Sequence, residues 1–173
     1  MATTETVAKA WALLRRAYPD HVQKHLGNAT DQKATMELYA RLLLDIPDDV
    51  LEAATMHHIT ESQWWPKVSE LRERATAIRM AAKQIPTEYE AWSQVYVNAR
   101  HSDRCEWSHP LVKLAIDRLG GIKAYAFSPL EDEPSWRAQY MRCYQGLVAR
   151  ERETVSELPQ IAAVTERLRL GAG

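Results

Sequence analysis

The sequence has little cysteine, little glycine and no long hydrophobic run. Its 173 residues include two cysteines and six glycines, and two of those glycines lie in the last three positions. Two cysteines, with no secretory signal in the polar start at residues 1–6, predict a reduced protein in the cytoplasm. No apolar run approaches the ~18–20 residues that span a bilayer, so no membrane partner is expected.

An excess of charge of one sign is also missing. The chain has 22 Lys and Arg against 23 Asp and Glu, which gives a formal net charge of −1. This balance argues against a protein that coats nucleic acid, although it permits a local basic patch. With 46% hydrophobic and 26% charged residues, the chain is typical of a globular protein and not of a disordered one.

The repeating pattern that is present is helical, because the alternation expected of strands does not occur. Apolar residues recur at i, i+4, i+7 and i+11 before Pro19, and again after Pro66 at spacings of three and four. We predict helices near 4–18, 30–44, 47–60 and 66–83, and a loop at 20–29 that contains Gly27-Asn28. The two stripes are Val7, Trp11, Leu14 and Tyr18, and Val68, Leu71, Ala75, Ile78 and Ala82.

A second helical region begins after Pro86. Thr87 to Glu90 is a capping-box pattern, and the following helix would turn Tyr89, Trp92, Tyr96 and Ala99 inward. A helix starting near Ser108 and Pro110 would end at Gly120-Gly121, and a long helix would span about 134–154. The predicted fold is all-α: an N-terminal four-helix bundle over 1–84, a second helical module over 85–158, and a short amphipathic, mobile tail over 159–173.

Sequence motifs for catalysis and nucleotide binding are missing. There is no G-x-S-x-G elbow, and Gly120-Gly121 lacks the spacing and the lysine of a phosphate-binding loop. The carboxylate pairs are explained by helix starts and an acidic loop. We therefore expect a protein that is not an enzyme and that needs no cofactor.

A weak metal pattern lies in the second half. His101, Cys105 and His109 recur every four residues, and Cys143 could supply a fourth ligand. Two histidines and two cysteines suit tetrahedral zinc. The competing interpretation is a polar loop followed by a core cysteine, because the spacing matches no established finger. The expected result is no metal, with these four residues as the candidates for one.

Two further patterns concern binding. Six tryptophans are present. Trp107 lies in a polar loop, and we expect it to be exposed and to contact a partner. Of Trp64 and Trp65, one can pack at the helix entry while the other faces elsewhere. A basic stripe of Arg72, Arg79 and Lys83 could meet the phosphates of DNA. Acidic residues interleave with it, so a solvated face of intrahelical pairs is the alternative.

Three blocks of the first half resemble a known family. They are Trp11 to Pro19, the junction Leu44-Asp45-Ile46-Pro47, and Trp65-Pro66-x-Val68-x-Glu70-Leu71-Arg72. In this order and spacing they resemble the N-terminal domain of the phage replicative-helicase loader/inhibitor family, over about residues 5–82.

The resemblance implies a small helical replication protein without ATPase activity. Its expected partners are a hexameric DnaB-type replicative helicase and an origin-bound replisome organiser, in the cytoplasm of a bacterial host. No helicase-binding residue of the family matches a position here. The tail supplies our candidate contact instead, because its amphipathic spacing has no obvious intramolecular partner. The candidate residues are Ile161, Val164, Leu168 and Leu170. The alternative function is a small DNA-binding regulatory protein that uses the basic stripe.

Overall fold

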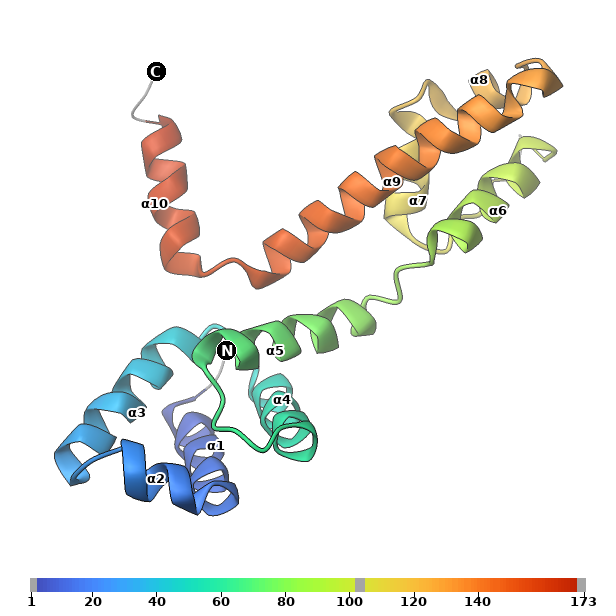
Figure 1. The fold of residues 1–173 in the computed structure, drawn as a ribbon. Coiled ribbons are helices and arrows are strands. Elements are labelled where there is room, and N and C mark those ends of the chain that lie inside the picture. The colour runs from blue at the N-terminus through green and yellow to red at the C-terminus, as the bar shows by residue number, and fades with distance from the viewer. Residues whose placement is uncertain (1–2, 102–104, 171–173) are drawn as a thin grey trace. The chain divides into compact units, whose positions relative to one another are not determined.

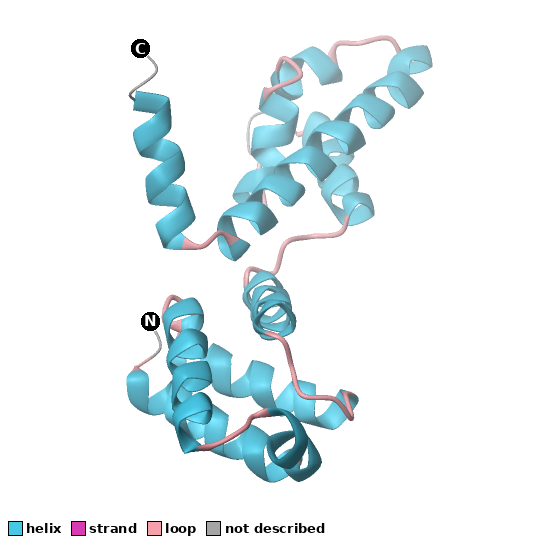
Figure 2. Cartoon of the chain, turned by 60° about the vertical axis from the view of Figure 1, so that its left-hand side comes forward, coloured by secondary structure: helices cyan, strands magenta, loops and turns pink. Residues whose placement is uncertain are grey.

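The computed structural model describes residues 3–101 and 105–170, and in the tail it omits the side chains at 160, 165, 169 and 170. Every regular element in these ranges is a helix, and no strand occurs in them (Figure 2). The prediction of an all-α fold is confirmed, whereas the four-helix arrangement of the first half stays a prediction. None of the described helices combines the length and the apolar character needed to cross a membrane.

The chain divides into two compact units. Unit 1 comprises residues 1–79 and 155–173, and unit 2 comprises residues 80–154. The helices that begin in unit 1 are α1 (Thr4–Ala17), α2 (Pro19–His25), α3 (Ala29–Leu43), α4 (Asp48–Glu61), α5 (Val68–Ala82) and α10 (Pro159–Leu170) (Figure 1). Those that begin in unit 2 are α6 (Glu88–Ala99), α7 (Pro110–Asp117), α8 (Gly121–Ala126), the short 3₁₀ turn η1 (Leu130–Asp132) and α9 (Glu133–Ser156).

Helix starts in unit 1 follow local capping chemistry. The Thr3 hydroxyl accepts from the Thr6 amide at the start of α1, and Asn28 and Asp31 form a reciprocal capping box at the start of α3. The predicted loop at 20–29 is wrong, because residues 19–25 form α2. Pro19 ends α1 and also occupies the first turn of α2, where its missing N–H costs nothing and its fixed φ suits a helix.

The core of unit 1 forms where α1 packs against α3 and α4 (Figure 1). The stripe predicted on α1 is confirmed, because Val7, Trp11, Leu14 and Tyr18 are all buried. This core is completed by side chains of α3, α4, α5 and the junction between α3 and α4, namely Leu43, Ile46, Leu51, Ala54, Leu71 and Ala75. The junction at residues 44–47 therefore contributes to the core as well as connecting two helices.

Unit 2 has a core of its own that is rich in aromatic rings. Trp92, Tyr125, Tyr140 and Tyr144 lie together with aliphatic side chains of α7. The Thr87 capping box is present, and Gly120 adopts a positive φ of 105° before α8. Tyr89 was predicted to face inward but is 71% exposed, with the Arg137 guanidinium over its ring.

Candidate functional site

The loop between α4 and α5, residues 62–67, presents the most exposed tryptophan among the described residues. Trp64 is 72% exposed, whereas Trp65 is half-buried. The backbone of Trp64 is fixed on both sides: its amide donates to the Ser62 hydroxyl at 3.1 Å, and that hydroxyl donates to the Trp64 carbonyl at 3.3 Å. The His58 Nε2 also lies 2.9 Å from this carbonyl. The indole is therefore presented to solvent from an ordered turn.

His58 is a buried part of this support. The Arg74 Nε donates to the His58 Nδ1 at 3.3 Å, so the proton of a neutral imidazole must lie on Nε2, which then donates to the Trp64 carbonyl. Arg74 is itself held by Glu61 at 2.5 Å, and this hydrogen bond is the main cause that lowers the pKa of the Glu61 carboxyl. A chain of polar contacts thus runs from an ion pair on the surface to the loop.

Trp65 anchors the loop from its inner side. Its Nε1 donates to the Tyr39 hydroxyl at 3.1 Å, and that hydroxyl donates to the Pro66 carbonyl at 2.6 Å. The Trp65 ring also packs edge-on against Trp11, with centroids 5.0 Å apart. Burial raises the pKa of Tyr39, so the phenol stays protonated and keeps donating.

A second tyrosine ties the start of the loop to α1. The Tyr18 hydroxyl donates to the Ser62 carbonyl at 2.8 Å, and its ring lies edge-on to Trp65. Two tyrosines and one histidine therefore hydrogen-bond three carbonyls of a six-residue segment, those of Ser62, Trp64 and Pro66. Such a number of fixed contacts leaves the backbone little freedom, although the Trp64 side chain remains exposed.

Helix α2 and the loop at residues 62–67 form the two walls of a groove. The His21 ring stacks on Trp65, with centroids 5.1 Å apart and planes 11° from parallel, and the His25 ring lies 5.0 Å from His21. Burial, with a smaller contribution from His25, lowers the pKa of His21. The lowered pKa favours the neutral imidazole, whose ring stacks on Trp65.

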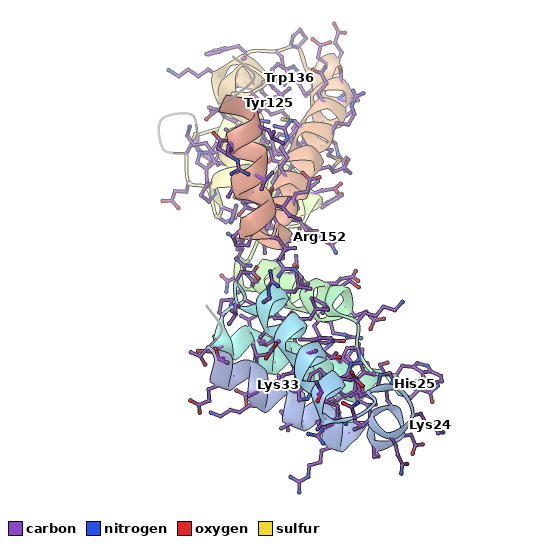
Figure 3. All side chains as sticks on the ribbon, turned by 90° about the vertical axis from the view of Figure 1, so that its left-hand side faces the viewer. Lys24, His25, Lys33, Tyr125, Trp136 and Arg152 are labelled. Carbon is purple, nitrogen blue, oxygen red and sulfur yellow. The ribbon has the colours of Figure 1, made fainter. Side chains whose placement is uncertain are left out.

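Between these walls lies a groove of about 560 Å³, which we call the Trp64 groove. Its volume falls within the ~300–1,000 Å³ usual for ligand pockets. Lys24 and His25 come from α2 and lie at the same edge of unit 1 (Figure 3). Among the residues that the structure describes, Asp20 supplies the single carboxylate of the lining. The groove is defined by Tyr18, His21, Lys24, His25, Trp64 and Trp65.

Basic side chains continue beyond the groove. Pro19 also lines a neighbouring hollow of about 740 Å³, together with Arg15 and Arg16 from the last turn of α1. Arg15, Arg16 and Lys24 form no ion pair with any other residue that the structure describes. These three cations are therefore available to an anionic ligand.

The predicted basic stripe has a different environment. Arg72 binds Asp45 through two hydrogen bonds of 2.6 and 2.9 Å and also donates to the Leu42 carbonyl. Arg79 donates to the Val155 carbonyl at 2.8 Å, and Lys83 pairs with Glu151 at 2.8 Å. All three cations have acceptors within the chain. A phosphate would have to compete with each of them.

The candidate zinc ligands have separate structural positions. His109 caps α7, where its Nδ1 accepts from the Leu111 amide at 3.2 Å. The Cys105 thiol lies 3.9 Å from the Asn98 carbonyl, Cys143 packs beside the core of unit 2, and His101 is exposed. No group of three or more His, Cys, Asp or Glu with metal-binding geometry occurs in residues 3–101 and 105–170.

The candidate partner contacts differ in exposure. Ile161, Val164 and Leu168 on α10 are 55%, 43% and 68% exposed, and their role as a partner contact stays a prediction. The side chain of Leu170 lies outside the described residues.

Trp107 is half-buried and packs against the core of unit 2, so the expectation that it would be the exposed tryptophan is wrong. The Asn98 side chain donates to the Glu106 carbonyl and accepts from the Glu106 amide, next to Trp107. Composition does not reveal this tertiary contact.

Fold and site together define an all-helical protein with an exposed aromatic groove in unit 1 and an apolar stripe on α10. Comparison with known proteins finds no matching protein family, no matching curated protein and no matching solved structure. Any functional proposal must therefore rest on the chain's own residues.

Proposed function

We propose that this chain is a replication accessory protein, not an enzyme, that binds a hexameric DnaB-type replicative helicase and loads or inhibits it. The observation that carries the proposal is the stripe of Ile161, Val164 and Leu168, three large apolar side chains exposed on one helix. Spacings of three and four residues place them on one face of α10. An amphipathic helix of this kind can lie in a hydrophobic groove of a partner.

The sequence resemblance supports the proposal through unit 1. Its three blocks lie together: Trp11 packs on Trp65, and Arg72 binds Asp45 with both terminal nitrogens. Tyr18 and Leu71 are buried in the same core. The matching residues thus build and stabilise a helical domain, and none of them lies on α10. This division is consistent with α10 as the helicase contact.

A loader without its own ATPase must act through differential affinity. A partner that binds one nucleotide state of the helicase ring more tightly shifts the ring toward that state. The proposed action needs a binding arm and a folded domain, and it needs no cofactor. The folded domain would then be the part available to an origin-bound replisome organiser. The proposed location is the cytoplasm of the bacterial host.

The test is size-exclusion chromatography with light scattering on the full chain mixed with a DnaB-type helicase, with and without ATP. The proposal expects a complex whose mass depends on nucleotide. A chain ending at Leu158 should lose it, as should Val164→Asp, which places a charge within the apolar stripe. The matched control is Ala163→Asp, one position away on another face of α10, which should keep the complex. Unchanged binding by the truncated chain would contradict the role of α10.

DNA binding through Arg72, Arg79 and Lys83 is the second candidate. Since each cation already has an acceptor in the chain, the contacts do not favour this candidate over the first. It predicts duplex affinity that falls steeply with salt and that is lost in Arg79→Ala. Salt-independent binding, or none, would exclude it.

A further inference from the structure

We propose that the Trp64 groove binds single-stranded nucleic acid, with a base stacked on Trp64 and the backbone phosphates near Lys24, Arg15 and Arg16. The proposed site lies in unit 1 and shares no residue with the apolar stripe of α10. It also differs from the basic stripe of α5. It therefore adds a second kind of ligand to the proposed function and can fail or succeed independently of helicase binding.

The first argument is the construction of the loop that holds Trp64. An indole left in water contributes little to folding, whereas burial of a large aromatic side chain stabilises by several kcal/mol. Here the adjacent backbone is nevertheless held by Ser62 and His58, and its flanks are held by Tyr18 and Tyr39. This polar network fixes the backbone that carries an exposed tryptophan, the residue type most often found among the residues that dominate binding interfaces.

The second argument is the geometry of the neighbouring rings. His21 and Trp65 already stack within 11° of parallel in the wall of the groove. Five of the ten residues that line the groove carry aromatic rings, and the Trp64 side chain is 72% exposed. Bases stack on such surfaces whatever their identity, because each has a planar π face.

The third argument is charge. The whole chain has a formal net charge of −1, yet the cations Arg15, Arg16 and Lys24 gather around two adjoining hollows that share Pro19. None of the three is neutralised by an ion pair with a described residue. Within the described part of the chain, one carboxylate, that of Asp20, lines the groove. A polyanion fits this distribution better than a proline-rich peptide, which would need the aromatic rings and not the cations.

A single strand fits better than a duplex. In a duplex the faces of the bases are covered by their stacked neighbours, so only base edges and phosphates are accessible. A single strand exposes base faces and phosphates together. The combination of an exposed indole with adjacent cations therefore points to single-stranded DNA or RNA.

The experiment measures the binding of a labelled oligothymidylate of about twelve nucleotides to the full chain by fluorescence anisotropy, at several salt concentrations. We expect measurable binding at low salt that weakens as salt increases. Trp64→Ala should weaken binding roughly tenfold, and Trp64→Phe should retain most of it, because a phenyl ring can still stack. Lys24→Ala should reduce the magnitude of the salt slope by about 0.7, the value for one phosphate on a single strand.

Matched controls separate stacking from nonspecific effects. Tyr89→Ala removes an aromatic side chain of similar exposure from unit 2, and Lys123→Ala removes an exposed cation there; both should bind as the parent does. Circular dichroism should give Trp64→Ala the same melting temperature as the parent, which excludes unfolding as the cause of lost affinity. The proposal is overturned by no binding at low salt, by equal binding of Trp64→Ala, or by equal affinity for a duplex or for an acidic peptide of the same charge.

Discussion

The two units use their aromatic residues in different ways. In unit 1, Tyr18, Tyr39 and Trp65 direct their polar atoms to one surface loop and to each other. In unit 2, Trp92 and Tyr140 lie ring against ring inside the core, with centroids 5.5 Å apart. Aromatic rings in unit 1 therefore position a surface feature, whereas those of unit 2 mainly fill an interior. Similar residue types therefore support a surface loop in one unit and fill a core in the other.

The paired tryptophan substitutions test this contrast most strongly. Trp92→Ala should lower the free energy of unfolding by about 3–5 kcal/mol, because a buried indole is lost and a cavity remains. Trp64→Ala should change it by less than about 0.5 kcal/mol, as expected for an exposed side chain. Urea unfolding followed by circular dichroism measures both. A large loss of stability in Trp64→Ala would mean that the exposed ring supports the fold after all.

The ion pairs give the next largest expected difference in stability between the two units. The side chains of Arg72 and Asp45 are only 13% and 10% exposed, so Arg72→Ala leaves a nearly buried carboxylate without its partner. We expect a loss of about 3–5 kcal/mol. The pair of Lys83 and Glu151 in unit 2 is more exposed, at 40% and 30%, and Lys83→Ala should cost about 1 kcal/mol or less.

A double variant separates charge from packing in unit 1. Replacing Arg72 and Asp45 together by Met and Leu removes both charges while keeping side-chain volume, and it should restore much of the stability lost in Arg72→Ala. The same urea titration measures it. Failure of the double variant to recover would assign the loss to the hydrogen bonds from Arg72 to the Leu42 and Ser156 carbonyls and not to the charge pair.

The removal of one tyrosine hydroxyl from each unit compares the two units through a smaller change in stability. Tyr18→Phe removes the hydrogen bond to the Ser62 carbonyl, and Tyr144→Phe removes the one to the Pro86 carbonyl. Each should cost about 1 kcal/mol of stability. Native-state hydrogen exchange should detect the difference, because only Tyr18→Phe should increase exchange at residues 62–67. Equal exchange of that loop in both variants would contradict its dependence on Tyr18.

The sequence predicted most of the helices, because periodicity and capping are local. The stripe on α1 and the Thr87 capping box required only neighbouring residues. The interior of the site required contacts between distant residues. Nothing near Arg72 in sequence indicates that Asp45 lies 2.6 Å from it, so the basic stripe was open to interpretation as a phosphate-binding face. The sequence indicated that Trp64 and Trp65 must face different ways. Which of them is exposed depends on Tyr39, Trp11 and His21, all remote along the chain.

The smallest predicted effect is the pH dependence of the His21 wall. Burial lowers the pKa of His21, and the nearby His25 ring, 5.0 Å away, lowers it further. The other charged groups in the lining of the groove are Lys24 and Asp20. A histidine whose pKa is lower in the folded state favours folding in its neutral form. Its contribution to stability is therefore fully present above the unfolded pKa of about 6.5 and is lost as the pH falls through the folded value. The titration of the His21 ring, followed by NMR, should give a pKa below 6.5. In His21→Phe, which keeps a ring on Trp65 but cannot be protonated, the loss of stability between pH 7 and 5 should be smaller than in the parent. An equal loss in both proteins would assign the acid sensitivity to other groups and would mean that the stacking of His21 on Trp65 does not depend on pH.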